Sequence, residues 1–176
     1  MTTTVHPLHK FRFCPVCGSE HFNENNALSK RCADCGFTYY FNPRGAVAVL
    51  ITNGRGDLLV ARRGKEPAKG TLDLPGGFID LHETAEEAAI REVREETGLT
   101  VKRAEYLLSE PNIYPYSGLE VHTIDLFFRC EADTDEPVRA MDDVAELLWV
   151  PLANLNIDDF GFASIRKGLK RYLSML

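Results

Sequence analysis

Apolar and polar positions divide the chain into short extended segments and two helices. Residues 45–52 form an almost continuous apolar run, which predicts a buried strand. The Asn-Gly-Arg-Gly turn that follows predicts a hairpin into a second strand at 57–61. Further extended segments are expected at 71–79, 101–109, 120–130 and 147–150. We expect residues 111–118 to form a loop.

Two segments have the spacing of amphipathic helices. Residues 84–97 form the first predicted helix. Thr84 and Glu87 have the spacing of a capping box at its start, and Gly98 is a typical residue for ending a helix. Residues 162–176 form the second helix. Its apolar side comprises Ile165, Leu169, Tyr172, Leu173 and Leu176. Strands and helices in this order predict an α+β or α/β fold, in which a mixed β-sheet is sandwiched between helices.

Residues 11–42 contain few aliphatic side chains and four of the five cysteines. A segment of this kind cannot build a core and needs a cross-link or a metal. The cysteines form two C-x-x-C pairs, each followed by glycine: Cys14, Cys17, Cys32 and Cys35. This spacing predicts one structural Zn²⁺ held by four thiolates. We predict a flexible tail over 1–10, a zinc ribbon over 11–42 and the main domain over 43–176.

Composition and charge narrow the function classes. The chain has 176 residues, of which 44% are hydrophobic and 26% charged, as is usual for globular proteins. A net charge of -6 argues against non-specific binding to nucleic acid or to a membrane surface as the main activity. Residues 1–10 lack the apolar stretch of an export signal, and no run reaches the roughly 18 residues of a membrane helix. We expect a cytoplasmic protein with no membrane association.

The first predicted helix carries three glutamates on one face. A helix turns about 100° per residue, so Glu92, Glu95 and Glu96 lie close together around its axis. Like charges at this spacing destabilise a helix, and a hard divalent cation with oxygen ligands removes the conflict. Taken alone, the three glutamates could also form the solvent-exposed acidic face of an ordinary helix. The residues around them favour a metal site, because a glycine turn, Glu83 and Arg91 precede them at fixed offsets.

The whole segment resembles the Nudix box at every defined position. It reads Gly77-x5-Glu83-x7-Arg91-Glu92-Val93-x-Glu95-Glu96-x-Gly98-Leu99. The resemblance implies a Nudix fold and metal-dependent hydrolysis of a pyrophosphate bond, with Mg²⁺ or Mn²⁺ as cofactor and one glutamate as base. The implied metal ligands are the Gly77 carbonyl, Glu92, Glu95 and Glu96. Glu83 and Arg91 are implied to orient the carboxylates, for which a bidentate guanidinium is suited.

A second acidic segment precedes Trp149. Many Nudix enzymes carry an acidic residue three positions before such a tryptophan, where it helps to bind metal or acts as base. Glu146 occupies that position. The resemblance therefore implies a catalytic and metal-binding role for Glu146, and an exposed loop carboxylate is the alternative.

A zinc ribbon directly before a Nudix domain resembles the NADH pyrophosphatase branch of the family. Residues 109–117 keep both serines and two prolines of that branch's S-Q-P-W-P-F-P-x-S signature, but they lack its tryptophan and carry Glu110 in place of glutamine. The resemblance implies that Tyr40 and Phe78 stack on a base and that Ser117 contacts the substrate. Packing between the ribbon and the core is the alternative for Tyr40.

These observations support an enzyme that acts on a nucleotide-type small molecule. The first hypothesis is hydrolysis of NADH or NAD⁺ to AMP and nicotinamide mononucleotide; ADP-ribose or another nucleotide pyrophosphate is the second. The alternative class is a ligand- or nucleic-acid-binding regulatory module, which the complete set of box carboxylates disfavours. NAD-capped RNA stays open as a substrate. The resemblance also implies a homodimer.

Overall fold

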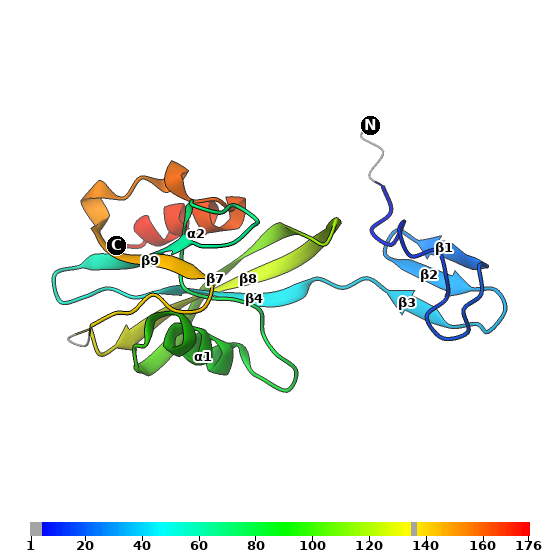
Figure 1. Ribbon diagram of the computed structural model, residues 1–176, viewed down its shortest axis with the longest axis horizontal. Helices are drawn as coiled ribbons and strands as arrows, with labels where there is room; N and C mark the ends of the chain where they lie inside the picture. Colours follow the sequence, from blue (N-terminus) through cyan, green and yellow to red (C-terminus); the bar gives the residue numbers. More distant parts are fainter. Residues whose placement is uncertain (1–4, 135–136) are drawn as a thin grey trace. The chain divides into compact units, whose positions relative to one another are not determined.

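The computed structural model describes residues 5–134 and 137–176. The chain divides into two compact units, Met1–Pro43 and Arg44–Leu176 (Figure 1). None of the described helices is long and apolar enough to cross a membrane.

The first unit is a small three-stranded sheet. Its antiparallel strands are β1 (Phe22–Asn26), β2 (Ser29–Cys32) and β3 (Thr38–Tyr40), in the order β1-β2-β3. Its hydrophobic cluster among the described residues comprises Cys14, Phe22 and Cys32, with Phe37 packed against them. A core of this size supplies little stability by itself, so a metal or cross-link is expected to support the unit.

Within the segment predicted to be a flexible tail, residues 1–10, Leu8 is fully buried. His6, two residues earlier, accepts a hydrogen bond from the Leu8 amide at Nδ1 (3.1 Å), and its Nε2 lies 2.9 Å from the Asn26 carbonyl oxygen of β1. This contact joins the segment around His6 to β1. Residues 1–4 of the predicted tail lie outside the described residues.

The described part of the second unit contains two three-stranded sheets and two α-helices. The strands are β4 (Arg44–Leu50), β5 (Asp57–Arg63), β6 (Leu72–Asp73), β7 (Val101–Tyr116), β8 (Leu119–Ala132) and β9 (Val144–Pro151). The helices are α1 (Ala85–Thr97) and α2 (Ala163–Leu173), with short 3-10 turns η1 (Leu152–Asn154) and η2 (Ile157–Asp159). One sheet has the order β4-β8-β7 and is mixed, because β4 is parallel to β8. The other, β6-β5-β9, is antiparallel.

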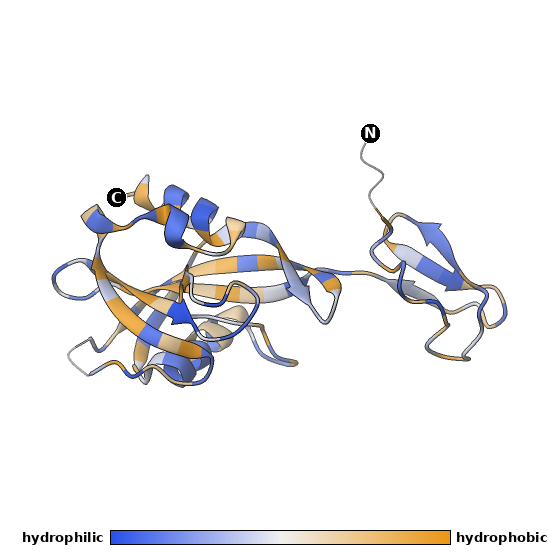
Figure 2. Cartoon of the chain, turned by 45° about the horizontal axis from the view of Figure 1, so that its top comes forward, coloured by the Kyte–Doolittle hydropathy of each residue, from blue (hydrophilic) through white to orange (hydrophobic). Residues whose placement is uncertain are grey.

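The sheets lie between the two helices because β4 is apolar on both faces. Side chains alternate along a strand. Ala48 therefore belongs to the core that contains Leu169 of α2, and Val49 to the core that contains Val93 of α1. Figure 1 shows the helices on opposite sides of the strands, and Figure 2 shows apolar residues along those strands. The predicted sandwich of a mixed sheet between helices is confirmed.

Helix α1 has the two ends that its sequence predicts. The Thr84 side chain accepts from the Glu87 amide, and the Glu87 carboxylate accepts from the Thr84 amide, so both bonds of a capping box are present. Gly98 ends the helix with a φ of 77°, in the left-handed region, and donates to the Arg94 carbonyl. These local bonds fix where the glutamate-rich face begins and ends.

The predicted loop over 111–118 is wrong, because β7 and β8 form one long hairpin. They pair as far as Tyr116 and Leu119, so only Ser117 and Gly118 form the turn. Proline is compatible with this position since β7 is at the end of the strand order β4-β8-β7. Pro111 and Pro115 are four residues apart, so their missing N–H groups point to the same side, away from β8.

Candidate active site

A cavity of about 480 Å³ lies in the second unit. Elements from both sheets and both helices line it. Its acidic lining residues are Asp73, Glu92, Glu96, Asp125, Asp142 and Asp143. Its aromatic lining residues are Phe78, Tyr114, Tyr116 and Phe162, and two arginines, Arg44 and Arg63, complete the charged groups. Carboxylates and aromatic rings thus line one cavity, which suits a ligand with a charged part and a planar part.

The glycine turn brings the backbone against β4 and α1. The Val47 amide donates to the Gly77 carbonyl oxygen at 2.8 Å. A Cβ at Gly76 would lie 2.0 Å from the Val47 carbonyl oxygen, and a Cβ at Gly77 would lie 2.4 Å from Glu92 Oε1. Gly76 therefore needs glycine, because its neighbour is backbone, and the Glu92 carboxylate sits directly beside Gly77.

Arg91 organises the glutamates around it. It donates from Nε and Nη2 to the two oxygens of Glu83, at 2.8 and 3.0 Å. Its Nη1 donates to Glu92 (2.8 Å) and Glu95 (2.9 Å), and Nη2 also reaches the Phe78 carbonyl (3.0 Å). The arrangement fits the orienting role that the sequence predicts for Glu83 and Arg91.

The pKa of Glu96, a carboxyl group that lines the cavity, is strongly raised. Burial raises its pKa to about 8, and the Gly76 amide, which donates to Oε2 at 2.9 Å, only partly opposes the shift. The negative charges of Glu92, Asp73 and Asp142 raise it further. Burial also raises the pKa of Glu92. Desolvated, mutually repelling carboxylates of this kind are stabilised by a cation.

The three box glutamates do not point in the same direction. Glu92 and Glu96 line the cavity, whereas the Glu95 side chain is 52% exposed and bonded to Arg91. In the described part of the chain, only the cysteines bring three or more ligand atoms within 4.8 Å of one another. The donor chemistry nevertheless fits Mg²⁺ or Mn²⁺, since Glu92 and Glu96 offer hard oxygens and the Gly77 carbonyl has a second lone pair.

The predicted site residue Glu146 lies within β9, and Asp142 and Asp143 lie just before this strand. Glu146 pairs with Arg62, whose Nε lies 2.9 Å from Oε2, and Glu146 does not line the cavity. The register of β9 explains this, because Arg62 and Glu146 are direct partners across the β5–β9 pair. Asp142 and Asp143 line the cavity instead. Asp142 has a φ of 51° and its charge raises the pKa of both Glu92 and Glu96.

The three predicted substrate contacts lie in different places. Phe78 lines the cavity. Ser117 is exposed in the β7–β8 turn with a φ of 50° and is not a lining residue. Tyr40 ends β3 in the other unit and is 54% exposed. Of the predicted metal ligands and substrate contacts in the described part of the second unit, Gly77, Phe78, Glu92 and Glu96 line this cavity.

Sequence reasoning missed two buried polar groups of the cavity floor. Arg63 donates to Asp73 at 2.8 Å, and burial raises the pKa of Asp73 despite this partner. Asp125 of β8 accepts from Thr123 and Ser164, both at 2.6 Å. The available signal was Asp125 itself, a charged residue between Ile124 and the apolar run Leu126–Phe128 of β8.

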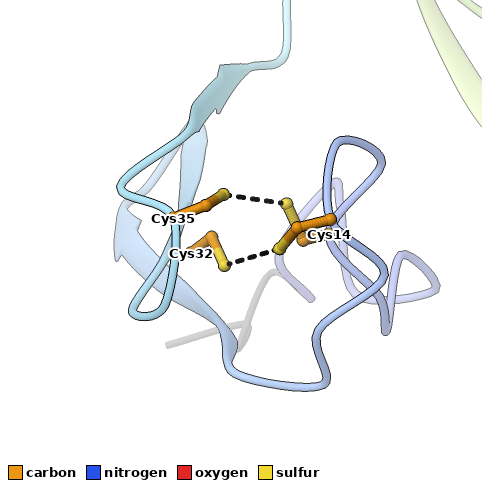
Figure 3. Close-up of side chains that lie close together, drawn as sticks. Cys14, Cys32 and Cys35 are labelled. Atoms are coloured by element: carbon orange, nitrogen blue, oxygen red, sulfur yellow. Dashed lines mark hydrogen bonds between the residues drawn. The ribbon is translucent and has the colours of Figure 1, made fainter.

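The four cysteines of the first unit form a second site, shown in Figure 3. The Sγ atoms of Cys14 and Cys35 are 3.7 Å apart, and those of Cys17 and Cys32 are 3.6 Å apart. Four sulfurs around a tetrahedral zinc with bonds of about 2.3 Å lie about 3.8 Å from one another. Hydrogen bonds from backbone N–H groups, with that of Cys35 the largest contributor, lower the pKa of Cys32 to about 6. The geometry and the thiol chemistry fit zinc.

Two matching turns position these thiols. In the first turn, the Cys14 amide donates to the Ser19 carbonyl and the Gly18 amide donates to the Cys14 carbonyl. In the second turn, the Cys32 amide donates to the Phe37 carbonyl and the Gly36 amide donates to the Cys32 carbonyl. Gly18 and Gly36 have φ values of 74° and 76°, which favour glycine. The sequence repeat C-x-x-C-G therefore folds into a structural repeat.

Comparison with known proteins defines the class. The model of the NUDIX domain matches residues 42–172, and the chain belongs to the Nudix family. The predicted family is confirmed.

Among curated proteins, the chain is similar to enzymes named NAD-capped RNA hydrolase NudC. The one from Vibrio parahaemolyticus is 31% identical over 120 residues, which cover 68% of this chain and 45% of that protein. The one from Stutzerimonas stutzeri is 28% identical over 162 residues, which cover 92% of this chain and 54% of that protein. The chain spans about half the length of these relatives.

Solved structures share the fold. A NUDIX hydrolase from Nitrosomonas europaea has a TM-score of 0.70 at 25% identity, covering 93% of this chain and 90% of that one. The NUDIX domain of Shewanella oneidensis NrtR, complexed with ADP ribose, has a TM-score of 0.60 at 19% identity, covering 76% and 88%. At that identity, the second comparison concerns the fold alone.

Proposed function

We propose that this chain is a metal-dependent pyrophosphatase that hydrolyses NADH or NAD⁺ to AMP and nicotinamide mononucleotide. The observation that carries the proposal is the single cavity in which Glu92 and Glu96 lie with the aromatic ring of Phe78. A dinucleotide has a diphosphate for the carboxylate site and a planar base for the aromatic residues. The similarity to the NudC enzymes supports the same substrate class.

Each box residue has a proposed task. Glu92, Glu95, Glu96 and the Gly77 carbonyl would hold Mg²⁺ or Mn²⁺. When bound, the ion neutralises the diphosphate and lowers the pKa of a water molecule. One of the glutamates removes the proton from that water, and Arg91 with Glu83 keeps the carboxylates in place.

A carboxylate from residues 142–146, at the start of β9, is proposed to complete the acidic site. The structure favours Asp142 for this task over Glu146, because Asp142 lines the cavity and Glu146 is paired with Arg62. Glu146 could take part only after leaving Arg62. Stacking of a base on Phe78 is supported by its place in the cavity, while the roles of Tyr40 and Ser117 stay predictions from the resemblance.

The cysteine site is proposed to hold one structural Zn²⁺. Four thiolates leave no open ligand position, so the ion would stabilise the ribbon and take no part in hydrolysis. We also propose a homodimer, which the family resemblance suggests. A cytoplasmic location is proposed from the paired cysteines.

A substrate panel tests the function. The full chain is incubated with Mg²⁺ or Mn²⁺ and NADH, NAD⁺, ADP-ribose, flavin adenine dinucleotide or nucleoside triphosphates, and the products are separated by chromatography. We expect AMP and the reduced or oxidised mononucleotide from NADH and NAD⁺. Glu95→Gln should lower turnover by about 10²-fold or more, whereas Glu86→Gln, on an exposed part of the same helix, should not. Absence of any diphosphate cleavage would reject the proposal.

NAD-capped RNA is the second candidate substrate. The names of the curated relatives favour it, because they describe NAD-capped RNA hydrolases. A short RNA with a 5′ NAD cap belongs in the same panel, beside free NAD⁺. Higher kcat/KM on the capped RNA than on free NAD⁺ would make RNA the preferred substrate.

A further inference from the structure

Five side chains form a continuous row along the cavity. The Arg44 guanidinium carbon lies 4.3 Å from the Phe78 ring centroid, and the Phe78 and Tyr114 rings meet edge to face at 5.6 Å. The Tyr114 and Phe162 rings are 5.5 Å apart, and the Arg63 guanidinium lies 4.9 Å from the Phe162 centroid. All five line the cavity. The row is a chain of aromatic rings with a cation at each end.

The two cations differ in their electrostatic surroundings. Arg63 is paired with the Asp73 carboxylate at 2.8 Å and is mostly buried. Arg44 is exposed, and across residues 5–134 and 137–176 its guanidinium forms no ion pair with a carboxylate. Its neighbours across the sheet are uncharged, because Arg44 pairs with Thr123 and Thr123 pairs with Asn112. No ion pair within the described residues therefore neutralises the positive charge that Arg44 places on the Phe78 ring.

We infer that Arg44 is a specificity-determining residue that makes the Phe78 ring favour an uncharged base over a positively charged one. The inference rests on the proposed function, because it assumes that a base of the substrate stacks on Phe78. The nicotinamide ring of NAD⁺ carries a positive charge, whereas the dihydronicotinamide ring of NADH and the adenine ring do not. The Arg44 guanidinium already uses part of the attraction between a cation and the Phe78 ring. A positively charged nicotinamide on the same ring would therefore be attracted less strongly, and it would also be repelled by Arg44.

The size of the effect follows from exposure and distance. Two charges on opposite faces of one ring are separated by about twice the distance of a single cation–ring contact. The interaction is weakened further because Arg44 is exposed to water and salt. We expect a preference of about 3- to 10-fold. The preference should shrink as ionic strength rises, because salt screens interactions between exposed charges.

The experiment compares NADH with NAD⁺, whose molecules differ only in the redox state of the nicotinamide. The kcat/KM of each is measured with Mg²⁺ for the full chain and for Arg44→Gln, Arg44→Lys and Arg55→Gln. Arg44→Gln should shift the NADH to NAD⁺ ratio about 3- to 10-fold toward NAD⁺. Arg44→Lys keeps the charge and should preserve the preference for NADH. Arg55→Gln removes an arginine that does not line the cavity, and the ratio should not change.

Equilibrium dialysis of NADH and NAD⁺ against the same variants, without Mg²⁺ or Mn²⁺, gives a readout that does not need catalysis. The same shift in the binding ratio is expected. An equal loss of affinity for both nucleotides in Arg44→Gln would overturn the inference, because Arg44 would then contact a part that both share. Binding with the expected ratio but without cleavage would reject the proposed hydrolysis and retain the role of Arg44. Binding of neither nucleotide would reject the inference.

Discussion

Arg91 and Glu83 form a bidentate ion pair, with Nε 2.8 Å from one carboxylate oxygen and Nη2 3.0 Å from the other. The remaining hydrogen bonds of this guanidinium reach Glu92, Glu95 and the Phe78 carbonyl. One residue therefore positions three carboxylates and the turn beside them. Arginine suits this position because its planar group carries five donors in a fixed arrangement, which lysine lacks.

Arg91→Lys keeps the charge but removes the bidentate geometry. We expect turnover with Mg²⁺ to fall about 10- to 100-fold, as is usual when the groups that orient metal ligands are replaced. The free energy of unfolding should change much less than turnover does. Arg94→Lys, three residues further along and exposed, is the control. Full turnover in Arg91→Lys would show that the positions of the carboxylates do not depend on the bidentate guanidinium.

Stability without Mg²⁺ or Mn²⁺ should depend on pH through Glu96. Its pKa is raised to about 8 from 4.5, mainly by burial, so the folded chain keeps a proton that the unfolded chain loses. The proton-linked stability is therefore complete below about pH 4.5 and is lost as pH rises to about 8. Urea unfolding from pH 5 to 8.5 should show this fall. Glu96→Gln should make the curve flatter, and a curve of unchanged slope would contradict the assignment.

The ribbon should carry about one Zn²⁺ per chain, measured by elemental analysis of the purified protein. Cys32→Ser removes a buried ligand, so the zinc should be lost and the first unit should unfold. Cys130→Ala is the matched control, because Cys130 is a buried thiol of the second unit whose pKa burial raises to about 12. Retention of zinc in Cys32→Ser would exclude the four-thiolate site.

Asp142→Asn and Glu146→Gln distinguish the acidic candidate just before β9 from the one within it. Asp142 lines the cavity, so its replacement should lower turnover by about tenfold or more. Glu146→Gln should have a smaller effect, because Glu146 is paired with Arg62. The apparent affinity for Mn²⁺ of each variant gives an independent measure. A larger loss in Glu146→Gln would mean that Glu146 leaves Arg62 when the substrate binds.

Features that depend on neighbouring residues could be predicted from the sequence. The ends of α1 follow from Thr84, Glu87 and Gly98, whose bonds are local. The two cysteine turns are equally local, because each glycine that follows a C-x-x-C pair closes its own turn. The glutamate face follows from helical periodicity alone. Family resemblance supplied the roles that such local patterns cannot specify.

Features that depend on tertiary packing could not be predicted in this way. Asp73 and Arg63 meet because β5 pairs with β6, and Ser164 reaches Asp125 because α2 packs beside the sheet. The position of Glu146 depends on the register between β5 and β9. Hydrophobic patterning identifies strands but does not give their partners, so the cavity floor was not predicted.

The two prolines of β7 have a consequence for solubility. A strand at the border of a sheet exposes unpaired backbone groups, onto which a second polypeptide can add as a further strand. Pro111 and Pro115 remove two donors from that border, along the stretch of the hairpin closest to its turn. Intermolecular strand addition is therefore hindered there, and the long hairpin can extend from the body of the domain without becoming a template for aggregation.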